Sequence, residues 1–137
     1  MRVLLTVILS LCVAPAFAAD WPDLLGTWKG TSRAVVLGEG GHYDGDTSGA
    51  KFLEAELTIE WTEQKDGRYI GTISSAKQTE AKLGVLSADG KSLFTVDTDG
   101  SSDGRLIDND HFELCYQQTS ASDPLMVASC VIFERQT

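Results

Sequence analysis

The sequence predicts an all-β domain, an eight-stranded antiparallel meander closed as an up-and-down barrel. Several segments alternate apolar and polar residues with a period of two, whereas almost none shows the helical period of 3.6. The clearest alternation runs from Leu53 to Thr62, where odd positions are apolar and even positions polar, so this strand has one buried and one solvated face. Lys65–Gly67, Asp89–Gly90 and Asp108–Asp110 have the residue types of hairpin turns.

The segments between these turns give eight expected strands. Their short connections favour antiparallel neighbours in sequence order, and closing the sheet on itself removes its exposed edges. A two-sheet β-sandwich is the alternative. The expected strands are Leu24–Leu37, Phe52–Glu63, Arg68–Ser75, Ala81–Ala88, Ser92–Asp97, Gly104–Ile107, Phe112–Gln118 and Met126–Arg135.

The N-terminus has the pattern of a secretory signal peptide, with Arg2 followed by an apolar run from Val3 to Val13 and small residues up to Ala18. The run is too short to span a bilayer. We expect cleavage after Ala18, one domain over residues 19–137, and a secreted or periplasmic location. Lipid attachment at Cys12 is less favoured, because Leu11 precedes it where a small residue is usual.

The charge balance narrows the range of partners. Removing residues 1–18 takes away Arg2 and no acid, so ten basic residues face 20 acidic ones, a net charge of −10. Such a surface repels phosphate backbones and anionic lipid, which argues against nucleic acid and membrane headgroups. No second apolar segment is long enough for a membrane span. The remaining candidates are a small molecule or another exported protein.

Two cysteines remain after cleavage, Cys115 and Cys130. In an oxidising compartment such a pair predicts a disulfide. The two residues are equidistant from the Ser122–Asp123 step in the polar loop Thr119–Pro124, which can place them opposite each other in an antiparallel pair. The bond would join the last two strands.

Short motifs resemble the lipocalin and avidin barrels. Leu25–Trp28 contains a Gly-Thr-Trp start to the first strand, and Gly67–Ile73 is similar to the Gly-Thr-Tyr strand of avidins. In lipocalin-type barrels the first-strand tryptophan closes the floor beneath a basic residue from near the chain end. The resemblance therefore implies that Trp28 and Arg135 form the barrel floor, stacked by cation–π attraction. Gly30 stands where avidins have asparagine, and no tryptophan follows Trp61, which argues against biotin.

Two acidic, glycine-containing segments resemble the start of a calcium loop. Asp44–Gly49 has oxygen ligands at alternate positions, but Ala55 occupies its twelfth position. The second, beginning at Asp99, offers the candidate ligands Asp99, Ser101, Asp103 and Asp110. No helical pattern flanks it, and Gly100–Gly104 also fits a hairpin turn. We therefore expect no metal site, and the sequence implies no cofactor.

The sequence offers little for catalysis. His42 and His111 are the only histidines, and no serine lies in a Gly-x-Ser-x-Gly motif. Glu54, Glu56 and Glu60 lie on the polar face of their strand, which favours solvation. We therefore expect no enzyme.

The leading hypothesis is a non-enzymatic binding module that contacts a small molecule through the barrel mouth and the long loop Gly38–Gly49. The candidate contacts are His42 and Tyr43 in that loop, and Trp61 and Tyr69 inside the barrel, although aromatic residues there can simply fill a narrow interior. The alternative is an interaction or inhibitor protein acting through its outer surface and loops. A filled interior with an exposed apolar patch would favour that alternative.

Overall fold

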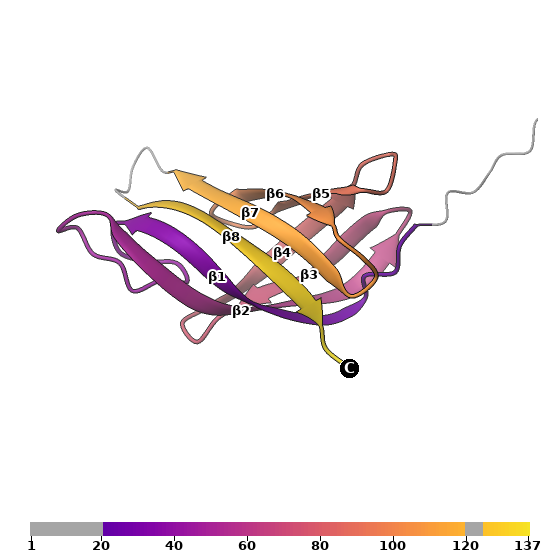
Figure 1. Cartoon of the computed structure of the whole chain (residues 1–137), viewed down its shortest axis with the longest axis horizontal. Helices are drawn as coiled ribbons and strands as arrows, with labels where there is room; N and C mark the ends of the chain where they lie inside the picture. The colour runs from indigo at the N-terminus through magenta and orange to yellow at the C-terminus, as the bar shows by residue number, and fades with distance from the viewer. Residues whose placement is uncertain (1–20, 120–124) are drawn as a thin grey trace, which may run out of the picture.

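The computed structural model describes residues 21–119 and 125–137. It shows one closed, all-antiparallel barrel with strand order β1 to β8 (Figure 1). The predicted signal peptide, residues 1–18, lies outside the described residues. The strands are β1 (Gly26–Leu37), β2 (Lys51–Lys65), β3 (Arg68–Ser74), β4 (Thr79–Leu86), β5 (Ser92–Val96), β6 (Ser101–Leu106), β7 (His111–Thr119) and β8 (Met126–Arg135).

Closure of the barrel depends on the pairing of the first strand with the last. β1 and β8 pair from Trp28 opposite Arg135 to Leu37 opposite Met126. Each other strand pairs with its neighbour in sequence, as the short turns predict. The barrel prediction is confirmed, and the sandwich alternative is excluded.

The predicted strand Gly104–Ile107 was wrong at its start, because β6 begins at Ser101. Oδ1 of Asp97 accepts hydrogen bonds from the backbone N–H groups of Asp99 at 3.3 Å and Gly100 at 2.9 Å. This side chain therefore forms the turn at residues 97–100, and Ser101 already pairs with Val96. Gly100–Gly104 is consequently not a hairpin turn.

A β-bulge changes the alternation at the end of β2. The register with β3 shifts between Trp61 and Glu63, so Thr62 and Glu63 are both exposed and Gln64 turns inward. Its side chain accepts a hydrogen bond from Leu24 N–H and donates one to the Pro22 carbonyl. The bulge thus connects β2 to the segment that precedes β1.

The predicted disulfide between Cys115 and Cys130 is present. The two residues lie directly opposite each other in β7 and β8, with their Cα atoms 4.0 Å apart. Their neighbours Leu114 and Val131 are buried, so alternation places both sulfurs on the outer face of the barrel.

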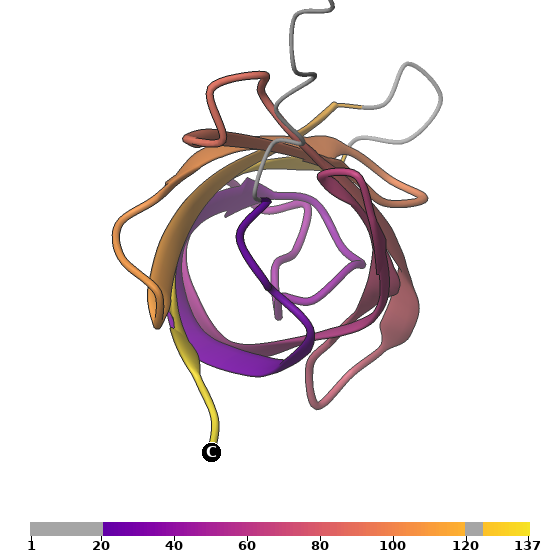
Figure 2. The ribbon, with the colours of Figure 1, turned by 90° about the vertical axis from the view of Figure 1, so that its right-hand side faces the viewer.

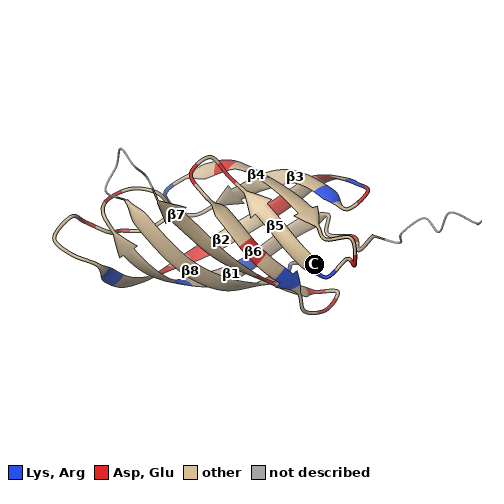
Figure 3. Ribbon diagram, turned by 90° about the horizontal axis from the view of Figure 1, so that it is seen from above, with Lys and Arg blue, Asp and Glu red and all other residues tan. Residues whose placement is uncertain are grey.

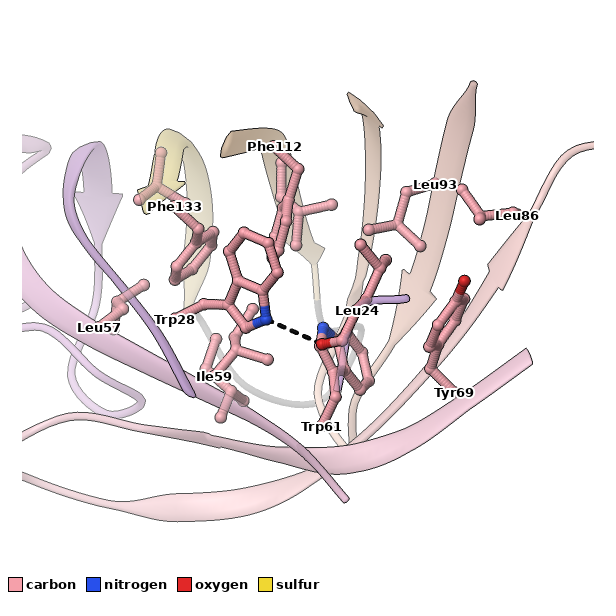
Figure 4. Close-up of a cluster of buried hydrophobic side chains, with 13 residues drawn as sticks. Leu24, Trp28, Leu57, Ile59, Trp61, Tyr69, Leu86, Leu93, Phe112 and Phe133 are labelled. Carbon is pink, nitrogen blue, oxygen red and sulfur yellow. Dashed lines mark hydrogen bonds between the residues drawn. The ribbon is translucent and has the colours of Figure 1, made fainter. Parts of the chain in front are cut away.

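The interior divides into two parts along the barrel axis. The first is an apolar cluster at the end where β1 begins and β8 ends, which we call the floor cluster (Figure 4). The second, towards the opposite end, is smaller and contains Ala34, Val36, Tyr43, Leu125 and Val127. The floor cluster comprises Leu24, Trp28, Leu57, Ile59, Trp61, Tyr69, Ile73, Leu86, Leu93, Phe112, Leu114, Val131 and Phe133.

Candidate functional site

Trp28 and Arg135 lie together at the floor of the barrel. The guanidinium carbon of Arg135 is 4.2 Å from the ring centroid of the fully buried Trp28. Arg135 also donates hydrogen bonds to the carbonyls of Leu25 at 2.8 Å and Asp23 at 2.6 Å. Trp28 Nε1–H donates to the Leu24 carbonyl at 2.9 Å (Figure 4). The segment before β1 is thereby held across this end of the barrel (Figure 2).

Trp61 and Tyr69 are part of the floor cluster. Their ring centroids are 5.8 Å apart, and each residue is only 1% exposed. The Tyr69 hydroxyl donates a hydrogen bond to the Pro22 carbonyl at 2.9 Å, and burial, with a smaller contribution from Asp23, raises the pKa of Tyr69 to about 12. The packing around these two ligand candidates is that of a filled core.

The other two ligand candidates, His42 and Tyr43, lie at the opposite end. The β1–β2 loop that carries them folds into the lumen (Figure 2). Gly38 and Gly41 have φ values of 98° and 62°, a region that favours glycine, and they allow the loop to turn back into the barrel. The Tyr43 side chain is buried, with its hydroxyl 2.6 Å from Ser32 Oγ. The loop therefore covers the mouth, as a lid would.

His42 is linked to two residues of the β3–β4 hairpin. Its Nδ1 is 2.9 Å from Ser75 Oγ, and its Nε2 is 3.0 Å from Glu80 Oε1. Ser75 Oγ also accepts hydrogen bonds from the backbone N–H groups of Lys77 at 3.1 Å and Gln78 at 3.4 Å. Sequence reasoning missed this Ser75–His42–Glu80 cluster, because its members are 33 and 38 positions from His42 and meet only when the loop enters the barrel.

Beneath His42 lies a buried ion pair. Lys82 Nζ and Asp97 Oδ2 are 3.0 Å apart, and their side chains are 1% and 2% exposed. The Tyr116 ring lies 5.9 Å from Lys82 Nζ, and the Tyr116 hydroxyl is 3.4 Å from Asp97 Oδ1. We call the space lined by Glu80, Lys82, Asp97, Tyr116 and Gln118, and covered by His42 and Tyr43, the mouth chamber.

The surroundings of Tyr116 in the mouth chamber disfavour loss of its proton. Burial is the main cause that raises the pKa of the Tyr116 hydroxyl, and the carboxylates of Asp97, Glu80 and Asp99 raise it further. Such a shift means that negative charge is disfavoured at that hydroxyl. The part of the shift that comes from the carboxylates would favour a positive group at this point, whereas burial disfavours charge of either sign.

With the loop in place the mouth chamber is nearly filled. The remaining cavity is about 30 Å³, which is room for one or two water molecules. The mouth chamber is therefore not an open, preformed pocket for a small molecule in this closed arrangement. Any larger ligand requires the loop to move.

The calcium candidates do not form a site. Ser101 and Asp103 lie in β6, Asp99 lies in the preceding turn, and Asp110 is 3.4 Å from Arg135 Nε. In the other segment, Asp46 pairs with Lys51, whose hydrogen bond lowers the pKa of that carboxyl to about 2. Within residues 21–119 and 125–137, no group of three or more His, Cys, Asp and Glu side chains could hold a metal ion.

The expected solvation of the β2 carboxylates is observed, since Glu54, Glu56 and Glu60 are all exposed. His111 is the first residue of β7, where Asp108 accepts its hydrogen bond at 2.9 Å and raises its pKa. It is therefore not part of the mouth chamber.

Comparisons with known proteins show similarity in fold only. No family model and no curated protein sequence matches the chain. A redesigned β-barrel is 11% identical, with a TM-score of 0.42 over 83% of this chain and 92% of that one. A protein of unknown function from the DUF3598 family of Nostoc punctiforme is 17% identical, with a TM-score of 0.47 over 91% of this chain and 53% of that one, so the match spans about half of its length.

A third similar structure is the S-type phycobiliprotein lyase CPES from Guillardia theta, 12% identical, with a TM-score of 0.35 over 83% of this chain and 89% of that one. These similarities are too distant to indicate a ligand. In the part of the chain that the structure describes, no helix is long and apolar enough to cross a membrane.

Proposed function

We propose that this protein is a non-enzymatic binding module that holds a small organic cation in the mouth chamber, beneath the Gly38–Gly49 loop. The observation that carries the proposal is the set of buried or nearly buried charged side chains, Glu80, Lys82 and Asp97, that lie beside apolar ones in this chamber, under a loop that folds into the barrel. A buried ion pair is not needed for stability, because well-packed apolar side chains of similar volume are often equally stabilising. The Lys82–Asp97 pair therefore supports a role in binding.

The charge of the chamber supports a cation as the ligand. The lining includes the carboxylates of Glu80, Asp97 and Asp99, against one lysine, Lys82. After burial, these three carboxylates are the next causes that raise the pKa of Tyr116, which supports a positive group beside that residue. The tyrosine ring adds a surface on which an ammonium group can pack.

The ligand can enter only when the loop opens. The hydrogen bonds that hold the loop to the barrel are few enough to allow this opening. The loop is held by the His42 contacts, by the Tyr43–Ser32 hydrogen bond, and by Lys77, which donates to the Tyr43 carbonyl and to Asp44. Each such hydrogen bond contributes about 1 kcal/mol net. Opening then costs several kcal/mol, a difference that a ligand with higher affinity for the open state can offset.

The Ser75–His42–Glu80 cluster is proposed as a latch rather than as a catalytic site. A serine hydroxyl has one donor and two acceptor positions. In Ser75 the two acceptor positions are occupied by Lys77 N–H and Gln78 N–H, which leaves the proton for His42. These contacts fix Ser75 in the turn after β3, and Ser75 and Glu80 together hold His42 of the loop, which supports a latch.

The test uses diaminoalkanes of two to five carbons as probes, with diols and dicarboxylates of the same length for comparison. Isothermal titration and thermal unfolding of the purified protein should show binding of a diamine and none of the uncharged or anionic analogues. Glu80→Gln should weaken that binding by roughly tenfold, since removing a partly desolvated charge partner costs at least about 1.4 kcal/mol.

Glu54→Gln is the matched control, because it makes the same chemical change on the exposed face of β2. It should leave the affinity for the diamine unchanged. Equal weakening by both substitutions would indicate non-specific attraction to an acidic surface and would refute the chamber as the site. Binding of the dicarboxylates in place of the diamines would refute the cation.

A further inference from the structure

The outer surface of β3, β4 and β5 carries a continuous apolar face. Five side chains on these strands are between 45% and 51% exposed. Ile70, Leu83 and Val96 lie opposite one another across the three strands, and Val85 lies opposite Phe94 in the adjoining row. We call these five residues the outer apolar face. β5 contains no charged residue and is tan throughout in Figure 3.

The second row of this face ends in opposite charges. Arg68 of β3 lies opposite Val85, and Asp103 of β6 lies opposite Phe94. The row therefore reads Arg68, Val85, Phe94, Asp103 across four neighbouring strands. Its midpoint falls between β4 and β5, with a basic and an acidic side chain at equal numbers of strands on either side.

We propose that a second copy of this chain packs on the outer apolar face, in a two-fold symmetric dimer. The two-fold axis would lie in the interface, parallel to β4 and β5 and midway between them. Rotation about this axis reverses the order of the row in the second copy, so that the first residue of one row faces the last residue of the other. Arg68 then meets the Asp103 of the second copy, and Val85 meets its Phe94. The same operation makes both contacts twice.

Arg68 and Asp103 are both free to form these contacts with a second copy. Arg68 forms an ion pair with Asp66 at 3.1 Å, in which both side chains are more than 60% exposed. Asp103 is exposed on β6. An exposed ion pair contributes little stability, so Arg68 can turn to a carboxylate on the second copy.

The size of the face sets the expected strength of the dimer. Five half-exposed side chains present on the order of 400 Å² of apolar surface, within the range of the largest patches on monomers. A typical stable interface buries about 800 Å² per partner. Together with Arg68 and Asp103, the outer apolar face has an area at the lower end of those found in stable interfaces. We therefore expect a dissociation constant on the order of micromolar.

Val96→Lys and Val35→Lys provide a matched pair of variants. Both replace an outward valine of similar exposure, 48% and 44% respectively, but Val35 lies on β1, which is not part of the outer apolar face. In sedimentation equilibrium over a concentration series, the wild-type protein should dimerise. Val96→Lys should weaken the dimer by roughly tenfold or more, because it buries a charge in the interface, and Val35→Lys should leave it unchanged.

Charge reversal tests the two-fold axis itself. Arg68→Asp and Asp103→Arg should each weaken self-association by roughly tenfold, since each brings like charges together in both contacts. An equimolar mixture of the two variants should dimerise again, because every contact in the heterodimer then joins an acid to a base. A monomer at all concentrations, dimerisation lost in Val35→Lys but kept in Val96→Lys, or failure of the mixture to associate would each overturn the proposal.

Discussion

Breaking the Lys82–Asp97 ion pair from one side should destabilise the protein much more than removing both charges. Lys82→Met leaves a carboxylate that is 2% exposed and that keeps hydrogen bonds from Asp99 N–H, Gly100 N–H and the Tyr116 hydroxyl. The loss of one member of a buried pair costs about 3–5 kcal/mol. Asp97→Asn keeps the turn hydrogen bonds and leaves the ammonium unpaired, so we expect about 3 kcal/mol.

The double variant removes both charges and keeps an amide oxygen for the turn. It should cost only about 1–2 kcal/mol relative to wild type, so that the two substitutions are coupled by at least about 2 kcal/mol. Urea unfolding of the four proteins at neutral pH, with the slope m checked for constancy, gives these values. Additive effects within about 0.5 kcal/mol would mean that the two groups do not interact in solution, and would remove the main support for a structured mouth chamber.

Three further predictions concern the scaffold. Reduction of the Cys115–Cys130 bond should lower the melting temperature by several degrees, since closing a loop of this length stabilises by about 3 kcal/mol; an unchanged melting temperature after verified reduction contradicts this. Arg135→Met should cost about 2 kcal/mol in urea unfolding through the lost Trp28 stack and carbonyl hydrogen bonds, whereas Arg105→Met, at an exposed ion pair with Glu113, should cost less than about 0.5 kcal/mol. Burial raises the pKa of Tyr69 to about 12 from 10.0, so the unfolded chain loses this proton at a lower pH than the folded protein, and the free energy of unfolding should fall from pH 10 to 12. Tyr69→Phe should reduce that fall. An equal fall in both proteins would contradict the raised pKa of Tyr69.

Alternation and turn residues predicted most of the fold because each strand has a strictly two-sided environment. The inward positions of β2, from Leu57 to Trp61, are buried, and the residues between them are not. The errors lie where a local contact competes with the pattern. Asp97 forms its turn through its own side chain, and the bulge near Thr62 shifts the alternation by one residue.

The mouth chamber was less predictable than the barrel. His42 and Tyr43 could be named as loop residues, but their partners Ser75, Glu80 and Ser32 depend on the loop turning into the lumen, which no periodic pattern encodes. Lys82 and Asp97 were missed as a pair, because an alternating strand is expected to point charges outward. In β4 the apolar residues Ala81, Leu83 and Val85 alternate with Glu80, Lys82 and Gly84, so alternation assigns Lys82 to the solvent, and the structure reverses that assignment.

The pairing of β1 with β8 also governs how the chain reaches its native state. The edge of β1 that faces β8 has no partner until the last ten residues of the barrel are synthesised, so the ring closes only through contacts between the two ends of the domain. Contacts of such long sequence separation make folding slow, typically milliseconds to seconds. A chain truncated before Met126 would keep an open sheet with two free edges, a form that associates readily with other strands.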